Sequence, residues 1–370
     1  MNAKIKRKII AHLANIIGWK TNRKIVVILS DDWGSIHTPS KEVREKLTQS
    51  GLDFQKDRFD YYDALEDDKD LTNLFEVLSS VKDKNGHPAV FTPYSVVTNP
   101  DFESIQSNNY SEYIYETLPV TYQKLPGYEK VWDLWKQGIN EGIFIPQFHG
   151  REHLNVRIMM DGLRKGDNQM LESLKYKSWA GIQGHPNYLA TYSFRTKEEN
   201  EWHKENLKDG LNLFEKLFGY KARFFVPPQG KYNRILEPSL KKEGIDFIDV
   251  PRIKYEPQLD GSSKKVYTYL GKKNKLNQKY IVRNAMFENT KAVGLDWVDF
   301  CLYSIDAAFN LRAPAVITTH RVNFVGHVVP SNRDKGLKDL KKLLQTITGK
   351  WPDVEFMSLE KLGNLMDNKK

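Results

Sequence analysis

The stretch "VVILSDDWGS", residues 26–35, runs from a row of apolar residues straight into two adjacent acids. Its first four residues, preceded by Ile25, are β-branched or aliphatic and predict a buried β-strand. The strand ends on Asp31 and Asp32, whose like charges repel each other more strongly when they are buried. Some other group in the folded protein should therefore offset that repulsion.

The composition excludes several classes of protein. The chain has 370 residues, enough for one large domain or two smaller ones, and Cys301 is its only cysteine. An internal disulfide and a cysteine-rich zinc site are thus excluded. The net charge is +9, but residues 1–24 hold seven bases and no acid, so the remainder is close to neutral. A basic excess confined to one end argues against nucleic-acid binding.

Residues 1–23 form a basic, amphipathic N-terminal segment, with apolar residues at helical spacing: Ile5, Ile9, Leu13 and Ile16. Such a segment predicts either a solvated terminus or peripheral contact with an anionic membrane through residues 1–20. Its apolar part, residues 9–19, is too short to span a bilayer, and no small-residue cleavage site follows it. We therefore expect a cytoplasmic protein that can touch the inner face of the membrane.

Residues 24–370 alternate between predicted strands and predicted helices and are expected to form one domain. Repeated strand–helix units indicate a parallel sheet covered by helices. With about seven units, the expected fold is a distorted (β/α) barrel, and an open doubly wound sheet is the alternative. The predicted strands are 24–30, 89–97, 143–148, 222–226, 245–250, 280–287, 314–319 and 354–357.

Two regions interrupt this alternation. The acidic stretch 51–70 predicts a solvated loop and helix. Residues 101–140 form an insertion rich in tyrosine and tryptophan, whose aromatic rings could form a small core or stack on sugars. The helices expected around these regions are 40–49, 70–82, 154–177, 197–218, 232–243, 297–311 and 334–347.

Chemically active residues follow several of the predicted strands. The carboxyl ends of parallel strands meet at one end of a barrel, so these residues should lie close together. They are Asp31 and Asp32, the pair His149 and His153 in "HGREH", the turn "PPQG" at 227–230, and His320.

Two histidines four residues apart can lie on one face and bind zinc, with a carboxylate as third ligand and an open position for water. One of Asp31 and Asp32 would then bind the metal, and the other would act as a base beside the water. Taken singly, the acids could be a helix cap, the His149–His153 pair could be surface residues, and His320 could be structural. Their common place at the strand ends favours the metal site.

The order of these motifs resembles the polysaccharide deacetylases of the NodB-homology type, carbohydrate esterase family 4. The matching stretches are "LSDDWG", "HGREH", "FFVPPQG" and "VITTH", and "PAVFTPYSVV" at 88–97 is similar to that family's second strand. The resemblance implies that Asp31 is the general base and that Asp32, His149 and His153 hold a divalent metal, usually zinc. It also implies that His320 protonates the leaving group.

The sequence departs from the family pattern at several positions. The family places an arginine before the Pro-Pro turn, where this chain has Val226, and Arg283 in "VRNAMFE" is the candidate to replace it. Trp33 follows the two acids in place of the usual Gly-Pro. We expect Trp33 and Arg283, with His185 and Asn187 of "GIQGHPNY", to contact the substrate.

The sequence thus predicts a metal-dependent hydrolase that removes acetyl groups from an N- or O-acetylated sugar of a polysaccharide or glycolipid, as in cell-envelope polysaccharide assembly. One alternative is a carboxylate-dependent glycoside hydrolase, which would need two separated carboxylates rather than adjacent ones. Another is a non-catalytic carbohydrate-binding or scaffold protein on the same fold. The sugar, its linkage and the oligomeric state are left open by the sequence.

Overall fold

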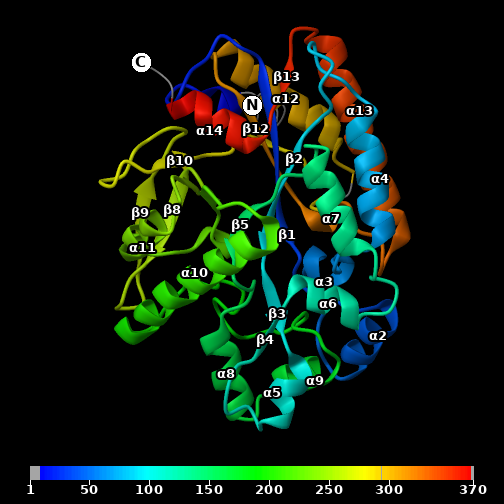
Figure 1. Ribbon diagram of the computed structural model, residues 1–370, viewed down its shortest axis with the longest axis vertical. Helices are drawn as coiled ribbons and strands as arrows, with labels where there is room; N and C mark the ends of the chain where they lie inside the picture. Colours follow the sequence, from blue (N-terminus) through cyan, green and yellow to red (C-terminus); the bar gives the residue numbers. More distant parts are fainter. Residues whose placement is uncertain (1–8, 293, 368–370) are drawn as a thin grey trace.

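A curled sheet of parallel strands forms the centre of the molecule in the computed structural model (Figure 1), which describes residues 9–292 and 294–367. Hydrogen bonds join its strands in the order β10 (Lys279–Ile281), β7 (Phe247–Asp249), β6 (Phe224–Phe225), β5 (Gln147–Gly150), β2 (Phe91–Val96), β1 (Ile25–Trp33), β12 (Ala315–His320) and β11 (Ala285–Met286). A short strand, β13 (Glu355–Phe356), pairs with the start of β1.

The two outermost strands of this order, β10 and β11, are separated in the chain by residues 282–284 alone. β10 pairs with β7, and β11 pairs with β12. Residues 279–286 therefore act as one bent strand that changes partners at Arg283, and this strand closes the sheet into a distorted barrel. Counted once, it gives the barrel seven strands among the described residues, so the predicted fold class is confirmed.

Strand β1 runs through the middle of the barrel wall and is buried along its whole length. Ile25, Val27 and Leu29 pack in the barrel interior, in a cluster with Phe224, Phe247 and Val316 from other strands. Val26 and Ile28 belong to the cluster between the sheet and the helices. Because side chains alternate along a strand, Asp31 continues the interior row.

Helices cover the outside of the barrel and close its amino end (Figure 1). Those of the outer layer are α4 (Asp68–Ser79), α7 (Val131–Asn140), α10 (Lys197–Phe218), α11 (Glu237–Lys242), α12 (Trp297–Asn310) and α13 (Pro330–Lys350). α14 (Leu359–Asp367) places Leu359, Leu362 and Met366 in the interior cluster.

Further elements gather beyond the carboxyl ends of the strands, in the lower part of Figure 1. They are α2 (Lys41–Gln49), α3 (Arg58–Tyr62), α5 (Phe102–Ser107), α6 (Leu118–Lys124), α8 (Val156–Arg164), α9 (Asn168–Lys175) and the antiparallel pair β3 (Thr98–Pro100) and β4 (Tyr115–Thr117). The hairpin β8 (Ile253–Pro257) and β9 (Ser263–Tyr267) lies at the side of the barrel. Among the described residues there are also three short 3₁₀ turns: Pro228–Gly230, Arg234–Leu236 and Arg321–Asn323.

Two predictions of local structure were wrong. The helix predicted over 154–177 is divided into α8 and α9, because Gly166 takes a positive φ of 74° and the Asp167 side chain caps the N-terminus of α9. The acidic stretch 51–70 is not a solvated loop, since Asp60, Asp63, Glu66 and Asp70 are all buried. Charge composition alone misses this burial because the compensating Arg321 and Arg333 lie far along the chain.

Candidate metal centre

The carboxyl ends of β1 and β5 bring together Asp32, His149 and His153. One ligand atom from each residue lies within 4.8 Å of the others, and all three residues are buried. The Nε2 atoms of His149 and His153 lie 3.2 and 2.9 Å from Oδ1 of Asp32. Donor atoms bound to one zinc ion are about 3–3.5 Å apart, given bonds of about 2 Å. The three side chains are therefore arranged as two nitrogen ligands and one oxygen ligand of a single cation.

The orientation of His149 suits a metal ligand. Its Nδ1–H donates a hydrogen bond of 2.8 Å to the backbone carbonyl of Val226, since a carbonyl can only accept. The lone pair is thereby placed on Nε2, the atom that faces Asp32. Val226 thus contributes through its backbone at the position where the family carries an arginine.

His153 is held by packing. Its ring stacks on Trp179 with a centroid distance of 5.6 Å and an interplanar angle of 12°. Burial lowers the pKa of His153, although Asp32 opposes that shift. Burial would raise the pKa of Asp32, but the adjacent imidazoles of His153 and His149 bring this pKa well below its ordinary value. A neutral imidazole and an ionised carboxylate are the forms that bind a metal.

The backbone at Asp32 explains how two adjacent acids serve one site. Asp32 has a φ of 76°, in the left-handed region, and the pairing of β1 with β2 shifts register between Ser30 and Trp33. In a regular strand the Asp32 side chain would point to the face opposite Asp31. The irregular turn brings it to the histidines instead, at a conformation that aspartate tolerates better than most residues.

Asp31 is bound by Arg283, the residue at which the bent strand changes partners. The guanidinium donates two hydrogen bonds to the two carboxylate oxygens of Asp31, at 2.9 and 2.7 Å. It also donates to Asp249 at 2.7 Å and to Thr318 at 2.9 Å. Burial alone would lower the pKa of Arg283, but Asp249 and Asp31 raise it well above its ordinary value, so the side chain stays charged.

The replacement arginine therefore comes from a different strand of the barrel. Arg223, three residues before Val226, forms ion pairs with Asp246 and Asp367 instead. Arg283, which was expected to contact the substrate, binds Asp31 and is not among the residues that line the cavity.

His320 lies on the other side of Asp31, with its Nε2 3.8 Å from Oδ2 of that acid. Its Nδ1 is 2.5 Å from Glu288, a buried acid that also accepts hydrogen bonds from Arg58 and Asn323. Burial would lower the pKa of His320, but Glu288, with smaller contributions from Asp32 and Asp31, raises it to about 9. His320 is consequently an imidazolium at neutral pH, the form that can donate a proton.

A cavity of about 190 Å³ lies at this site, and Asp31 and His149 are not among the residues that line it. Asp32, His153 and His320 line it, together with Gln229 of the "PPQG" turn. The sequence analysis missed several further residues of this region. They are Glu288, Arg58 and Arg321, with Asp57, Asp60 and Asp63 from the acidic stretch. Glu288 could have been found, because it directly follows a predicted strand.

Three other residues expected at the substrate lie elsewhere. Trp33 has no exposed surface and donates its Nε1–H to Ser30, so it cannot contact a substrate in this conformation. His185 pairs with Asp167 at 3.0 Å, and Asn187 accepts a hydrogen bond from Lys231. Neither residue lines the cavity, although Leu189 of the same loop does.

Comparison with known proteins gave matches among solved structures. No protein-family model and no curated protein matches the sequence. A structure described as a polysaccharide deacetylase from Mycobacterium smegmatis is 11% identical, with a TM-score of 0.47, over 96% of this chain and 94% of that one.

Two further matches cover most of both chains. The peptidoglycan deacetylase PdaC from Bacillus subtilis is 11% identical, with a TM-score of 0.36, over 94% of this chain and 93% of its own. Puue allantoinase is 10% identical, with a TM-score of 0.46, over 94% and 91%. Polysaccharide deacetylases, the family whose motifs the sequence resembles, are thus among the solved structures similar to this chain. At such low identity, any activity has to be argued from the residues of this chain itself.

Proposed function

We propose that this protein is a metal-dependent hydrolase that removes acetyl groups from an N- or O-acetylated sugar of a polysaccharide or glycolipid. The observation that carries the proposal is the arrangement around one small cavity. Two histidines and Asp32 form a cation site, and Asp31 and an imidazolium at His320 stand beside it. Metal-assisted hydrolysis of an acyl group needs this set of groups.

The residues present fit a divalent cation, and zinc suits two nitrogen ligands and one oxygen ligand best. Asp32, His149 and His153 would hold it. When bound, such a cation lowers the pKa of water and polarises a carbonyl. This fit is supported by the tautomer of His149, whose Nδ1–H is already engaged by the Val226 carbonyl.

The remaining residues would move the protons. Asp31 accepts a proton from the attacking water, while Arg283 keeps its carboxylate oriented. His320 donates its proton to the nitrogen or oxygen that leaves the acetyl carbon, and Glu288 keeps His320 charged for that step. The water oxygen bonds to the acetyl carbon, and the bond from that carbon to the sugar nitrogen or oxygen breaks. The sugar is left with a free amine or hydroxyl, and the acetic acid gives its remaining proton to solvent to become acetate.

Acetate release from a panel of acetylated glycans tests this function. Zinc-loaded protein should release acetate, and Asp31→Asn and His153→Ala should each reduce the rate by at least a hundredfold. His87→Ala is the matched control, because the His87 side chain is largely exposed and lies outside the cavity. Failure to retain a divalent metal after zinc is supplied, or full activity of Asp31→Asn, would contradict the proposal.

The alternatives receive less support from the site. The absence of an arginine at position 226 favoured a non-catalytic protein. That argument is weakened because Arg283 forms an ion pair with Asp31 instead. A carboxylate-dependent glycoside hydrolase would use two separated carboxylates and no metal, whereas Asp32 lies with two histidines in an arrangement that suits a cation.

We also propose peripheral membrane contact through the N-terminal segment, of which residues 1–8 lie outside the described part. From residue 9 onward, five aliphatic side chains are 45–62% exposed: Ile9, Ile10, Leu13, Ile16 and Ile17. Among the described helices, none is long and apolar enough to cross a bilayer. Flotation with anionic liposomes should recover the full chain, and a chain lacking residues 1–20 should remain in the lower fraction. Equal behaviour of the two would contradict this contact.

A further inference from the structure

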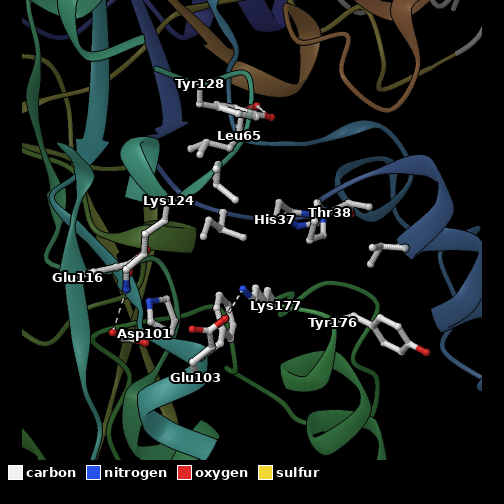
Figure 2. Close-up of a pocket in the computed structure, with 16 residues that line it drawn as sticks. His37, Thr38, Leu65, Asp101, Glu103, Glu116, Lys124, Tyr128, Tyr176 and Lys177 are labelled. Atoms are coloured by element: carbon white, nitrogen blue, oxygen red, sulfur yellow. Dashed lines mark hydrogen bonds and ion pairs between the residues drawn. The ribbon is translucent and has the colours of Figure 1, made fainter. Parts of the chain in front are cut away.

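A second cavity, of about 440 Å³, shares the lining residue His37 with the cavity at the metal centre. Figure 2 shows the residues that line it. It is formed by the segment that follows β1, by α2, by the elements around β3 and β4, and by the end of α9. In Figure 2, His37 and Thr38 lie on one side of the cavity, and Glu103 and Lys177 lie across from them. Its volume falls in the range of cavities that hold small molecules.

The lining of this cavity is mostly carbon. Six aliphatic residues contribute to it: Ile36, Pro39, Val43, Leu65, Pro100 and Leu125. Phe102 and Tyr128 extend this surface. A surface of this kind gains free energy by burying alkyl groups and offers few partners to sugar hydroxyls.

The charged residues of the cavity are already paired with one another. Lys124 bonds to Glu116 and Asp101, and Lys177 bonds to Glu103 (Figure 2). All five charged side chains are thus engaged in ion pairs, and because two lysines face three acids the lining disfavours an anionic group. The mostly apolar lining is suited to a neutral, aliphatic group.

Two ring contacts connect this cavity to the metal centre. His37 lines both cavities and lies edge-on against Trp179, with a centroid distance of 4.4 Å. Trp179 stacks in turn on the metal-ligand candidate His153. The two cavities therefore adjoin at His37, and a molecule with its acyl carbonyl at the metal centre would reach the second cavity past this side chain.

We propose that this cavity binds an unbranched alkyl or acyl chain of the substrate, so that the enzyme acts on an amphipathic, lipid-bearing molecule. Assignment of the chain to the substrate rests on the proposed function. Binding of the chain itself does not, and it can be measured without turnover and without metal.

The test measures binding of n-butyl, n-hexyl and n-octyl β-D-glucosides below their micelle concentrations, by titration calorimetry on the full chain. Affinity should rise about three- to fourfold for each added methylene. Val43→Trp and Leu125→Trp fill the cavity from different elements, and each should weaken binding of the octyl compound at least tenfold. Val120→Trp is the control, because Val120 is 38% exposed on α6 and does not line the cavity.

Affinity that does not depend on chain length, or that both cavity-filling variants leave unchanged, would overturn the proposal. If one variant does not fold, the other variant and the chain-length series of the unaltered protein still test whether the cavity binds the alkyl chain. Binding of the alkyl chains by a protein that releases no acetate would leave this inference standing and count against the proposed function alone. Release of acetate without chain-dependent binding would leave the proposed function standing and overturn this inference.

Discussion

Asp31 and Asp32 are adjacent in the sequence, yet the protein treats their charges in opposite ways. Asp31 faces Arg283, a buried guanidinium that binds both of its carboxylate oxygens. Asp32 faces two histidines and, within the part of the chain that the structure describes, no arginine or lysine at salt-bridge distance. One acid is thus neutralised by the chain itself, and the other is left with ligands that suit a cation. The repulsion that the sequence presents is resolved differently on the two sides of the same strand end.

The largest expected effect comes from removing the permanent counter-ion. Arg283→Met leaves Asp31 and Asp249 buried without their partner, which should cost about 3–5 kcal/mol of unfolding free energy. Chemical denaturation measures this loss. Arg223→Met, directly before β6, should cost less than about 1 kcal/mol, because its ion pairs are partly exposed. Equal losses in the two variants would contradict the assignment of Arg283 as the buried counter-ion of Asp31.

The Asp32 side should respond to a cation. Addition of zinc at 100 times its Kd to metal-free protein should raise the unfolding free energy by about 2.7 kcal/mol. Asp32→Asn should abolish most of that increase, because the amide is a weaker ligand than the carboxylate. Thermal denaturation with and without zinc measures both. An unchanged increase in Asp32→Asn would show that the zinc binds elsewhere.

Glu288→Gln should change the pH dependence of acetate release. His320 must be protonated to act as an acid, and its pKa of about 9 depends mainly on the charge of Glu288. In the variant this pKa should fall toward the ordinary value of about 6.5, which would lower the rate about 30-fold at pH 8 and little at pH 6. A pH–rate profile of both proteins provides the measurement, with pH 6 as the internal control. If the rates of the two proteins fall at the same alkaline pH, Glu288 does not keep His320 protonated.

The smallest effect is expected from the loop that the sequence analysis placed at the substrate. His185→Ala removes one partly exposed pair with Asp167 and should change stability by less than about 1 kcal/mol. Acetate release should remain within about twofold, because His185 does not line the cavity. A rise of KM without a change in Tm would return His185 to the substrate site.

Much of the fold and the metal centre could be predicted from local patterns. The apolar run that ends on Asp31, the spacing of His149 and His153, and the alternation of strands and helices are all short-range features. The helix predicted over 197–218 has the bounds of α10, Lys197–Phe218. The aromatic insertion was harder to interpret, since Tyr122 and Trp135 are buried in the main hydrophobic cluster.

The sequence by itself determined which chemical groups follow which strands, because strand periodicity and the common direction of parallel strands are local rules. Only the tertiary structure decided how the charges are paired. Arg283 reaches Asp31 across 252 positions of sequence, and Arg321 reaches Asp63 across 258. The left-handed turn at Asp32 is likewise fixed by the strand pairing around it. Such pairings depend on which strands become neighbours in the closed barrel, a property that no short stretch of the chain contains.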